Sequence, residues 1–412
     1  MNVLSLFDGM SCGQQALERI GIKVDNYFAS EIKPHAIKVT QHNYPNTKQL
    51  GSIVNVDGYS LPKIDLLIGG SPCQSFSFAG KRKGMSTKDE QEILTLNHYM
   101  QLKEEAYDFE GQSYLFWEYM RLLNEVKPKY FLLENVMMGE KWEKVLSKAI
   151  GVKPIMINSN LVSAQNRQRL YWTNIGLEPA GLFGDLETII KQPKDKGILL
   201  KDILEKEVDL KYFINEKMIK SFENHKERHK EKDTGFGFNP KNVYDKGNCL
   251  RANAAICPTY NMIIVHNMMP RSSTSGKGGT GHLTRNDGKT YCLDTGNTNA
   301  VEYFEQVNSI KNDGLILSGN MRGGKWENTH ESSRRVYDSD GKAPTIPTMQ
   351  GCNQHPKTLH KSKIRRLTPL ECERLQTVKD NYTNYVSDSQ RYKMLGNGWT
   401  VDIIAHIFSY IK

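Results

Sequence analysis

The chain begins with the apolar run Asn2-Val3-Leu4-Ser5-Leu6-Phe7, followed directly by the glycine-containing stretch Asp8-Gly9-Met10-Ser11-Cys12-Gly13. The apolar run is typical of a short buried β-strand, and helical spacing of apolar residues begins at Cys12. A strand that leads through glycines into a helix is the usual start of a βαβ unit, and such glycines let a cofactor approach the backbone. This opening therefore indicates an α/β fold.

The same alternation continues to about residue 176. We expect strands at residues 3–7, 27–30, 65–68, 130–133, 155–158 and 170–173, and helices at residues 12–20 and 113–126. Strands and helices that alternate in this way form a parallel sheet. The sequence therefore predicts a doubly wound, mostly parallel sheet, interrupted at residues 88–110 by an acidic, helical insertion to which we assign no chemistry.

From about residue 180 to 362 the composition shifts toward Gly, Asn, Ser, Thr and Lys, with short strands and Asp-Gly turns. We expect a second, smaller, β-rich domain at residues 181–362, inserted into a first domain that comprises residues 1–180 and 363–412. Three similar segments are either repeated hairpins or a chance recurrence of turn residues: Val243–Asn248, Thr284–Lys289 and Val336–Lys342.

Composition limits the class of protein. Hydrophobic residues make up 38% of the 412 residues and charged residues 25%, and no apolar run is long enough to cross a bilayer, so we expect no membrane association. The seven cysteines are scattered without a Cys-x-x-Cys pair, which favours reduced thiols in a cytoplasmic protein and predicts no metal site. The net charge of +9 favours association with polyanions such as DNA or RNA.

Two acidic residues fall at the carboxyl ends of expected strands, where the ligand crevice of a parallel sheet lies. Glu31 follows the glycines by about twenty residues, a position at which a carboxylate can accept hydrogen bonds from both ribose hydroxyls of a nucleoside. Glu134 closes the expected strand at 130–133, where a partly desolvated carboxyl group suits proton donation. The first residue indicates a nucleoside cofactor and the second an acid–base group.

A cysteine follows a third strand, within Gly69-Gly70-Ser71-Pro72-Cys73-Gln74-Ser75-Phe76-Ser77. Free cysteines are commonly buried structural residues. Cys73, however, lies in a turn of Gly, Ser and Pro and is followed by Lys81 and Arg82, a cationic setting that favours the reactive thiolate. We therefore interpret Cys73 as a nucleophile.

Farther along, Gln165, Arg167 and Arg169 alternate at a period of two, so their side chains are expected on one face of an extended segment. Two aligned arginines suit a phosphate, a carboxylate or the carbonyl group of a base.

In order and spacing, these segments resemble the motif set of the DNA cytosine-C5 methyltransferases, over about residues 1–176 and 363–412. The catalytic part looks closest to the animal de novo type, whereas the second domain is far longer. The resemblance rests on Phe7-x-Gly9-x-x-x-Gly13, Glu31, Pro72-Cys73-Gln74, Glu134-Asn135-Val136, Gln165-x-Arg167-x-Arg169, Leu367-Thr368-Pro369-x-Glu371-Cys372-x-Arg374-Leu375-Gln376 and Gly396-Asn397.

The resemblance implies a reaction and its catalytic residues. Cys73 would attack carbon 6 of a cytosine flipped out of duplex DNA, and Glu134 would hold N3 and the exocyclic amine. Arg169, helped by Arg167, would hold the base carbonyl and its phosphate. S-adenosylmethionine would supply the methyl group for carbon 5. The residues expected to contact DNA are Gln74, Ser77, Lys81, Arg82 and Gln165.

The resemblance also implies a cofactor site. Its expected residues are Phe7, Asp8, Gly9, Gly13, Glu31, Ile32, Ser52, Ile53, Pro72, Leu115, Asn397 and Trp399. One departure concerns Gly51-Ser52, where the family usually has Gly-Asp. The hydrogen bond that this Asp makes to the adenine amine is therefore expected to be weaker or to come from elsewhere.

By the same resemblance, residues 181–362 would be a target recognition domain. We expect a monomer that acts on double-stranded DNA in the cytoplasm of a prokaryotic cell or as a virus-encoded protein. Two alternatives stay open: an RNA (tRNA) cytosine methyltransferase on the same fold, and a catalytically silent DNA-binding homologue. Intact Cys73, Glu134 and Arg169 favour an active enzyme, and Ser52 keeps the silent homologue under consideration.

Overall fold

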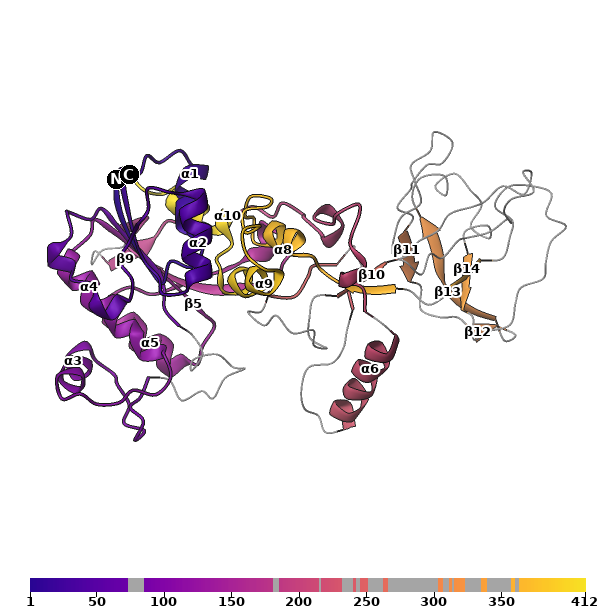
Figure 1. Cartoon of the computed structure of the whole chain (residues 1–412), viewed down its shortest axis with the longest axis horizontal. Helices are drawn as coiled ribbons and strands as arrows, with labels where there is room; N and C mark the ends of the chain where they lie inside the picture. Colours follow the sequence, from indigo (N-terminus) through magenta and orange to yellow (C-terminus); the bar gives the residue numbers. More distant parts are fainter. Residues whose placement is uncertain are drawn as a thin grey trace. The chain divides into compact units, whose positions relative to one another are not determined.

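The computed structural model describes residues 1–72, 85–180, 185–214, 216–231, 240–241, 245–250, 262–265, 303–306, 311–312, 315–322, 335–338, 357–359 and 363–412. The chain forms two compact units, both drawn in Figure 1. The first unit comprises Met1–Leu204, Tyr244–Ile256 and Pro369–Lys412, and the second comprises Glu205–Val243 and Cys257–Thr368.

A seven-stranded sheet forms the centre of the first unit. Its strands are β1 (Asn2–Leu6), β2 (Asn26–Ser30), β3 (Lys48–Gln49), β4 (Leu66–Gly70), β5 (Tyr130–Val136), β6 (Ile155–Asn158) and β7 (Gln168–Thr173). Across the sheet their order is β3-β2-β1-β4-β5-β7-β6, and β7 runs antiparallel to its neighbours while the other pairs are parallel. The central strands are buried along nearly their whole length, as strands covered on both faces should be. The predicted doubly wound, mostly parallel sheet is confirmed.

Helices cover both faces of this sheet (Figure 1). The described helices of the first unit are α1 (Cys12–Arg19), α2 (Pro34–Asn43), α3 (Leu96–Glu104), α4 (Phe116–Val126), α5 (Glu140–Ile150), α8 (Pro369–Leu375), α9 (Asp388–Asn397) and α10 (Val401–Phe408). α4 and α5 lie on one face, and α1, α2 and α10 lie on the other. α10 packs against α1, so the end of the chain returns to its beginning.

Two expected elements differ from the observed ones. The helix expected at 113–126 consists of a 3₁₀ turn, Ser113–Leu115, followed by α4. β5 continues past the expected end to Val136, because Asn135 and Val136 pair with Leu170 and Arg169 of β7. Glu134 therefore lies within a paired strand rather than just beyond one.

The insertion at residues 88–110 is tied to α4 through one buried carboxylate. Glu118 of α4 is fully buried and accepts hydrogen bonds from the Tyr99 hydroxyl (2.6 Å), Lys103 Nζ (2.5 Å) and Arg121 Nε (2.7 Å). Several charged or polar donors are what a buried carboxylate requires. The insertion is thus an ordered part of the first unit.

Smaller elements complete the first unit. The hairpin strands β8 (Leu177–Ala180) and β9 (Asp185–Thr188) pair antiparallel. Further 3₁₀ turns are Ile53–Asn55, Gly58–Ser60, Ser159–Leu161 and Leu200–Asp202.

The described part of the second unit is largely β-structure, as predicted. β10 (Met262–Val265) pairs antiparallel with β16 (Lys363–Arg366). A second sheet has the order β11-β13-β14-β15, with β12 also paired to β13. Its strands are β11 (Tyr303–Gln306), β12 (Lys311–Asn312), β13 (Leu315–Arg322), β14 (Arg335–Asp338) and β15 (Lys357–Leu359). The unit also contains the turn Leu210–Tyr212 and the helix α6 (Glu216–Glu231).

The three loosely similar sequence segments do not share one structure. Residues 245–248 belong to the first unit and form no strand of their own, whereas β14 covers the start of the third segment. The middle segment, Thr284–Lys289, lies outside the described residues.

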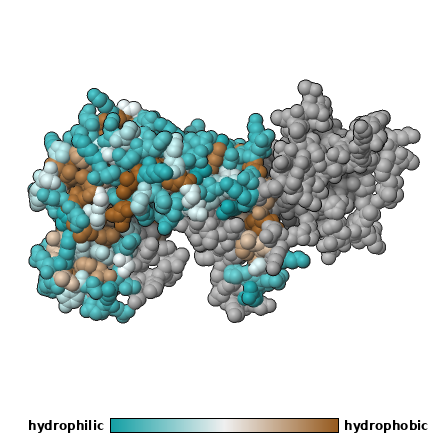
Figure 2. Space-filling model, in the orientation of Figure 1, coloured by the Kyte–Doolittle hydropathy of each residue, from teal (hydrophilic) through white to brown (hydrophobic). Residues whose placement is uncertain are grey.

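The surface of the first unit is mostly hydrophilic on the face drawn in Figure 2, with apolar residues interspersed. Among the described residues, no helix combines the length and apolar character needed to span a membrane. The same part of the chain holds no group of three or more His, Cys, Asp or Glu side chains that could bind a metal ion.

Candidate active site

The segments singled out by the sequence meet at the carboxyl edge of the sheet. The strand order reverses between β1 and β4, which is where open α/β sheets bind ligands. Leu6 of β1 is aligned with Ser30 of β2 and Gly69 of β4, and Gly70 is aligned with Glu134 of β5. The loops after β1, β2 and β4 and the Glu134 side chain therefore share one edge.

The loop between β1 and α1 has an unusual backbone. Phe7, Gly9 and Ser11 adopt left-handed conformations, with φ of 57°, 61° and 58°. Such conformations are strained for phenylalanine and serine, and strain of this kind concentrates at ligand sites. Asp8 accepts hydrogen bonds from the Tyr27 hydroxyl (2.8 Å) and the Ser11 hydroxyl, which hold the loop in shape. Burial raises the pKa of Asp8 to about 6.

Glu31 lies at the end of β2 and is bonded to this loop. Its Oε2 accepts the Gly9 backbone N–H (2.9 Å), and its Oε1 accepts the backbone N–H groups of Ile32 (2.8 Å) and Lys33 (2.9 Å). An ionised carboxylate offers about four acceptor positions, so about one is left for a ribose hydroxyl rather than the two the sequence predicted. The neighbouring Ile32 side chain is 62% exposed and offers an apolar surface for a base. This pair fits a nucleoside cofactor.

The other predicted cofactor residues have mixed environments. A Cβ at Gly13 would lie 2.3 Å from Ile68 Cδ1, so glycine is required there for α1 to pack on β4. Ser52 begins the turn Ile53–Asn55, whose first side chain is buried. The half-buried residues are Pro72, Leu115 and Trp399, and Asn397 is exposed. Their contact with the cofactor stays a prediction.

Glu134 is held from two sides. Arg169 Nε lies 2.9 Å from its Oε1, and Trp399 Nε1 donates to its Oε2 at 3.1 Å. The carboxyl group is nearly buried, with 11% of the side chain exposed. Among the described residues, each oxygen thus accepts one hydrogen bond, and a carboxylate oxygen can accept a second one from a ligand.

The neighbouring Asn135 fixes the end of β4. Asn135 Nδ2 donates to Ser71 Oγ at 3.0 Å, and both residues are buried. The segment that leads into Cys73 is therefore fastened beside Glu134. Cys73 itself and the predicted DNA contacts Gln74, Ser77, Lys81 and Arg82 lie outside the described residues.

The three alternating polar residues before and within β7 do not share one role. Arg169 reaches Glu134, but Arg167 is a buried residue, only 3% exposed, and its guanidinium group donates to the carbonyl oxygens of Gly396 (3.2 Å) and Gly398 (2.9 Å). Arg167 therefore supports the chain that leads to Trp399, instead of facing a base or phosphate as the sequence predicted. The shared face was expected from strand alternation, which does not specify the partners of each side chain.

Gln165 is fully buried. Its Nε2 donates to the Leu375 carbonyl and to Gln376 Oε1, both at 3.2 Å, and its Oε1 accepts the Leu250 N–H at 2.8 Å. All its polar atoms are bonded within the protein, so the predicted contact with DNA is at odds with its position. A buried amide that joins three segments is a structural group.

Sequence reasoning missed Cys249. Its Sγ accepts hydrogen bonds from Arg167 (3.3 Å) and Arg169 (3.7 Å). Burial raises the pKa of this thiol, but the two guanidinium groups outweigh burial and the pKa is lowered overall. The cysteine is carried by residues 245–250, which Lys246 fastens to the first unit through the Asn160 carbonyl (2.9 Å). No local motif marks it, because its partners are distant in sequence.

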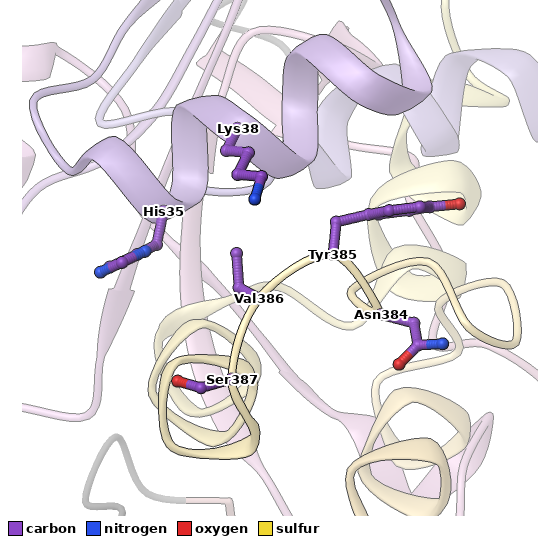
Figure 3. Close-up of a pocket in the computed structure, with 6 residues that line it drawn as sticks. All are labelled: His35, Lys38, Asn384, Tyr385, Val386 and Ser387. Carbon is purple, nitrogen blue, oxygen red and sulfur yellow. The ribbon is translucent and has the colours of Figure 1, made fainter.

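One further cavity, of about 480 Å³, opens between the first turns of α2 and the loop before α9 (Figure 3). It is lined by His35, Lys38, Asn384, Tyr385, Val386 and Ser387. None of the residues predicted for catalysis, cofactor or DNA is among them.

Known proteins are similar to this chain over nearly its whole length. The sequence profile of the C-5 cytosine-specific DNA methylase family matches residues 1–412. The orphan methyltransferase M.SPRI of Bacillus phage SPR is 28% identical, with 99% of this chain and 96% of that protein covered. The type II methyltransferase M.HgiCI of Herpetosiphon aurantiacus is 26% identical, with 96% and 93% covered.

Solved structures share the fold. The S. pombe Dnmt2 methyltransferase has a TM-score of 0.51 at 14% identity, covering 99% of this chain and 97% of its own. The Entamoeba histolytica methyltransferase EhMeth has a TM-score of 0.54 at 16% identity, covering 100% and 97%. Because the family profile spans the whole chain, the protein belongs to the C-5 cytosine-specific DNA methylases and is an S-adenosylmethionine-dependent enzyme that methylates carbon 5 of cytosine in DNA.

Proposed function

We propose that methyl transfer proceeds through a covalent bond between the Cys73 sulfur and carbon 6 of a flipped cytosine, with Glu134 binding the pyrimidine edge. The observation that carries this proposal is the Glu134 carboxylate, fixed at the carboxyl edge of the sheet by Arg169 and Trp399. The next residue, Asn135, donates a hydrogen bond to Ser71, which leads into the Cys73 loop.

The reaction requires a nucleophile and a group that stabilises the negative charge that develops on the cytosine ring. Addition of the Cys73 thiolate to carbon 6 pushes electrons onto carbon 5 and toward N3, where the hydrogen-bonded Glu134 carboxyl group stabilises the change. The bound donor supplies an electrophilic methyl group from its sulfonium to carbon 5. The carbon 5 proton then leaves to water and the thiolate is expelled, which restores both the ring and the enzyme.

Arg169 has a share in both binding and orientation. Its Nε holds Glu134. Its Nη1 donates to the Gln168 carbonyl oxygen at 2.8 Å, and its Nη2 donates to Cys249 Sγ. A planar guanidinium can bond several acceptors in fixed directions. We assign Arg169 to the base carbonyl and Arg167 to support of residues 396–398.

The donor is assigned to the edge formed by the β1–α1 loop and β2. Glu31 supplies an acceptor for a ribose hydroxyl, and Ile32 supplies an apolar surface for adenine. Asp8 supplies a negative charge for the positively charged end of S-adenosylmethionine. Ser52 takes the place of an acidic residue, so the adenine amine has a weaker acceptor there.

Residues 181–362, most of which belong to the second unit, are assigned to recognition of the DNA sequence. This segment is rich in Gly, Asn, Ser, Thr and Lys, a composition that suits contacts with phosphates and base edges. We propose a cytoplasmic monomer that reads duplex DNA. Sedimentation of the purified protein with and without a DNA duplex measures the stoichiometry, and a dimer in both states would refute it.

Trapping tests the covalent step. The methylated site is first mapped by bisulfite sequencing of DNA from a methylation-free host that expresses the protein. A duplex with 5-fluorocytosine at that site should then form an adduct that survives denaturation, because fluorine cannot leave as the proton does. Cys73→Ser should bind the duplex but form no adduct and no methylcytosine, and an adduct in this variant would refute the assignment. Parallel assays with tRNA test the RNA alternative.

A further inference from the structure

A single indole N–H links the carboxyl-terminal segment to the proposed catalytic carboxylate. Trp399 lies between α9 and α10, and its Nε1 donates to Glu134 Oε2 at 3.1 Å. The other oxygen, Oε1, lies 2.9 Å from Arg169 Nε. Two donors that are distant in sequence, one from β7 and one from the segment before α10, thus define the direction of this carboxyl group.

The backbone around Trp399 is pinned on both sides. Arg167 and Gln376 donate to the Gly398 carbonyl, at 2.9 Å and 3.2 Å, and the Thr400 hydroxyl donates to Gln376 Oε1 at 2.9 Å. The groups involved are largely buried. A side chain on so rigid a support can hold another group in place, whereas one on a loose loop could not.

The neighbouring strand β4 leaves room for the hydrogen bond between Trp399 and Glu134. A Cβ at Gly70 of β4 would lie 3.0 Å from Trp399 Nε1 and 3.1 Å from Glu134 Oε2. Both distances are shorter than ordinary van der Waals contact, so a methyl group at position 70 would push the indole and the carboxylate apart. Gly70 therefore gives a way to disturb the hydrogen bond without altering either partner.

We propose that Trp399 is a positioning residue for Glu134, in addition to the cofactor contact predicted for it. Its N–H holds the carboxylate in the direction needed to bind the pyrimidine edge, whether or not the methyl donor is bound. This inference rests on the proposed function, because it takes Glu134 as the group that meets the base. The Trp399 side chain then has two roles: its ring contacts the cofactor, and its N–H binds the Glu134 carboxylate.

The two roles can be measured separately, because the first chemical step needs no methyl donor. When the thiolate adds to carbon 6, carbon 5 becomes basic and takes a proton from water. Loss of the original carbon 5 hydrogen to water, followed by expulsion of the thiolate, regenerates cytosine. Release of tritium from DNA labelled at carbon 5 of cytosine therefore reports thiol addition and the support from Glu134 without S-adenosylmethionine.

The test compares three variants on carbon-5-tritiated genomic DNA from a methylation-free host, without donor. Trp399→Phe keeps an aromatic ring but removes the N–H, and the tritium release rate should fall by about tenfold. Gly70→Ala should lower the same rate by about threefold or more, because it displaces both partners. Trp142→Phe makes the same chemical change in the core on α5 and should leave the rate of the folded protein at the wild-type value.

Circular dichroism at the assay temperature establishes that each variant is folded, and donor affinity is measured by calorimetry. Wild-type tritium release by Trp399→Phe and Gly70→Ala would overturn the inference, and weaker donor binding by Trp399→Phe alone would then leave only the cofactor role. If Trp399→Phe does not fold, Gly70→Ala decides. The proposed function fails in a different way: wild-type protein would release no tritium, or Glu134→Gln would release it at the full rate.

Discussion

At the residue scale, Asp8 should make the binding of the methyl donor depend on pH. Burial raises its pKa to about 6, and its oxygens are bonded to the Tyr27 and Ser11 hydroxyls beside Glu31. Above this pKa the carboxylate attracts the cationic donor, and below it the proton removes that attraction. We expect donor affinity to fall by roughly 3- to 10-fold as the pH is lowered from about 7.5 to about 5.

Calorimetric titration of S-adenosylmethionine across this range provides the measurement. Asp8→Asn should bind the donor more weakly at neutral pH and lose most of the pH dependence, because the titrating group is gone. An unchanged pH profile in this variant would show that Asp8 is not the group responsible for the dependence.

A second residue-scale prediction concerns the thiols. Burial raises the pKa of Cys12 to about 12, whereas the arginines beside Cys249 lower its pKa. The thiolate is the form that reacts with alkylating agents. Limiting iodoacetamide near neutral pH should therefore label Cys249 before Cys12 and Cys372, as followed by peptide mass spectrometry. Equal labelling of Cys12 and Cys249 would contradict the arrangement of the two guanidinium groups.

At the element scale, Gln165 joins the segment before β7 to the end of α8 and to residues 245–250. Gln165→Leu leaves the Leu250 N–H without its buried acceptor and removes one of the two side-chain donors to the Leu375 carbonyl and to Gln376 Oε1. This loss should lower the free energy of unfolding by about 1–3 kcal/mol. Urea denaturation measures this change. The exposed Gln168 is the matched control, since Gln168→Leu should change stability by about 0.5 kcal/mol or less.

The same variants distinguish a structural role from a DNA contact. If Gln165 supports the fold, Gln165→Leu binds DNA normally at temperatures where it is folded. A loss of DNA affinity with unchanged stability would instead restore the contact that the sequence predicted.

At the scale of the whole molecule, the net charge of +9 and the DNA substrate predict binding that depends strongly on salt. Each neutralised phosphate contributes about −0.9 to the slope of log affinity against log salt concentration. With four or five such contacts, affinity should fall by roughly 100- to 1,000-fold between about 50 and about 200 mM salt. Fluorescence anisotropy with a duplex tests this, and a flat dependence would show that apolar contacts dominate.

Most of the sheet could be predicted because its information is local. Runs such as Leu66–Gly70 are apolar along their whole length, which is how strands covered on both faces differ from surface strands. The ends of elements were less predictable. β5 extends to Val136 only because β7, which comes later in the chain, provides hydrogen-bond partners for it.

The candidate site likewise has features that could be predicted from the sequence and features that could not. The identity of Glu31 and Glu134 and their place at the carboxyl edge of the sheet could be inferred from spacing, because parallel strands bring their carboxyl ends together. The partners of buried polar groups could not. Alternation predicted one face for Gln165, Arg167 and Arg169, yet their bonds go to Leu375, Gly398 and Glu134 respectively.

By itself, the sequence determined the α/β fold class, the edge of the sheet that carries the chemistry and the family to which the enzyme belongs. Apolar periodicity within each element indicates the fold class and the strand ends, because it depends on neighbours within one element, whereas the family follows from the resemblance of the ordered motifs. Tertiary structure alone decided that Trp399 bonds Glu134 across 265 positions of the chain, that Arg167 supports this contact and that Cys249 joins the arginines. A buried donor must find an acceptor, and folding decides which distant segment provides it.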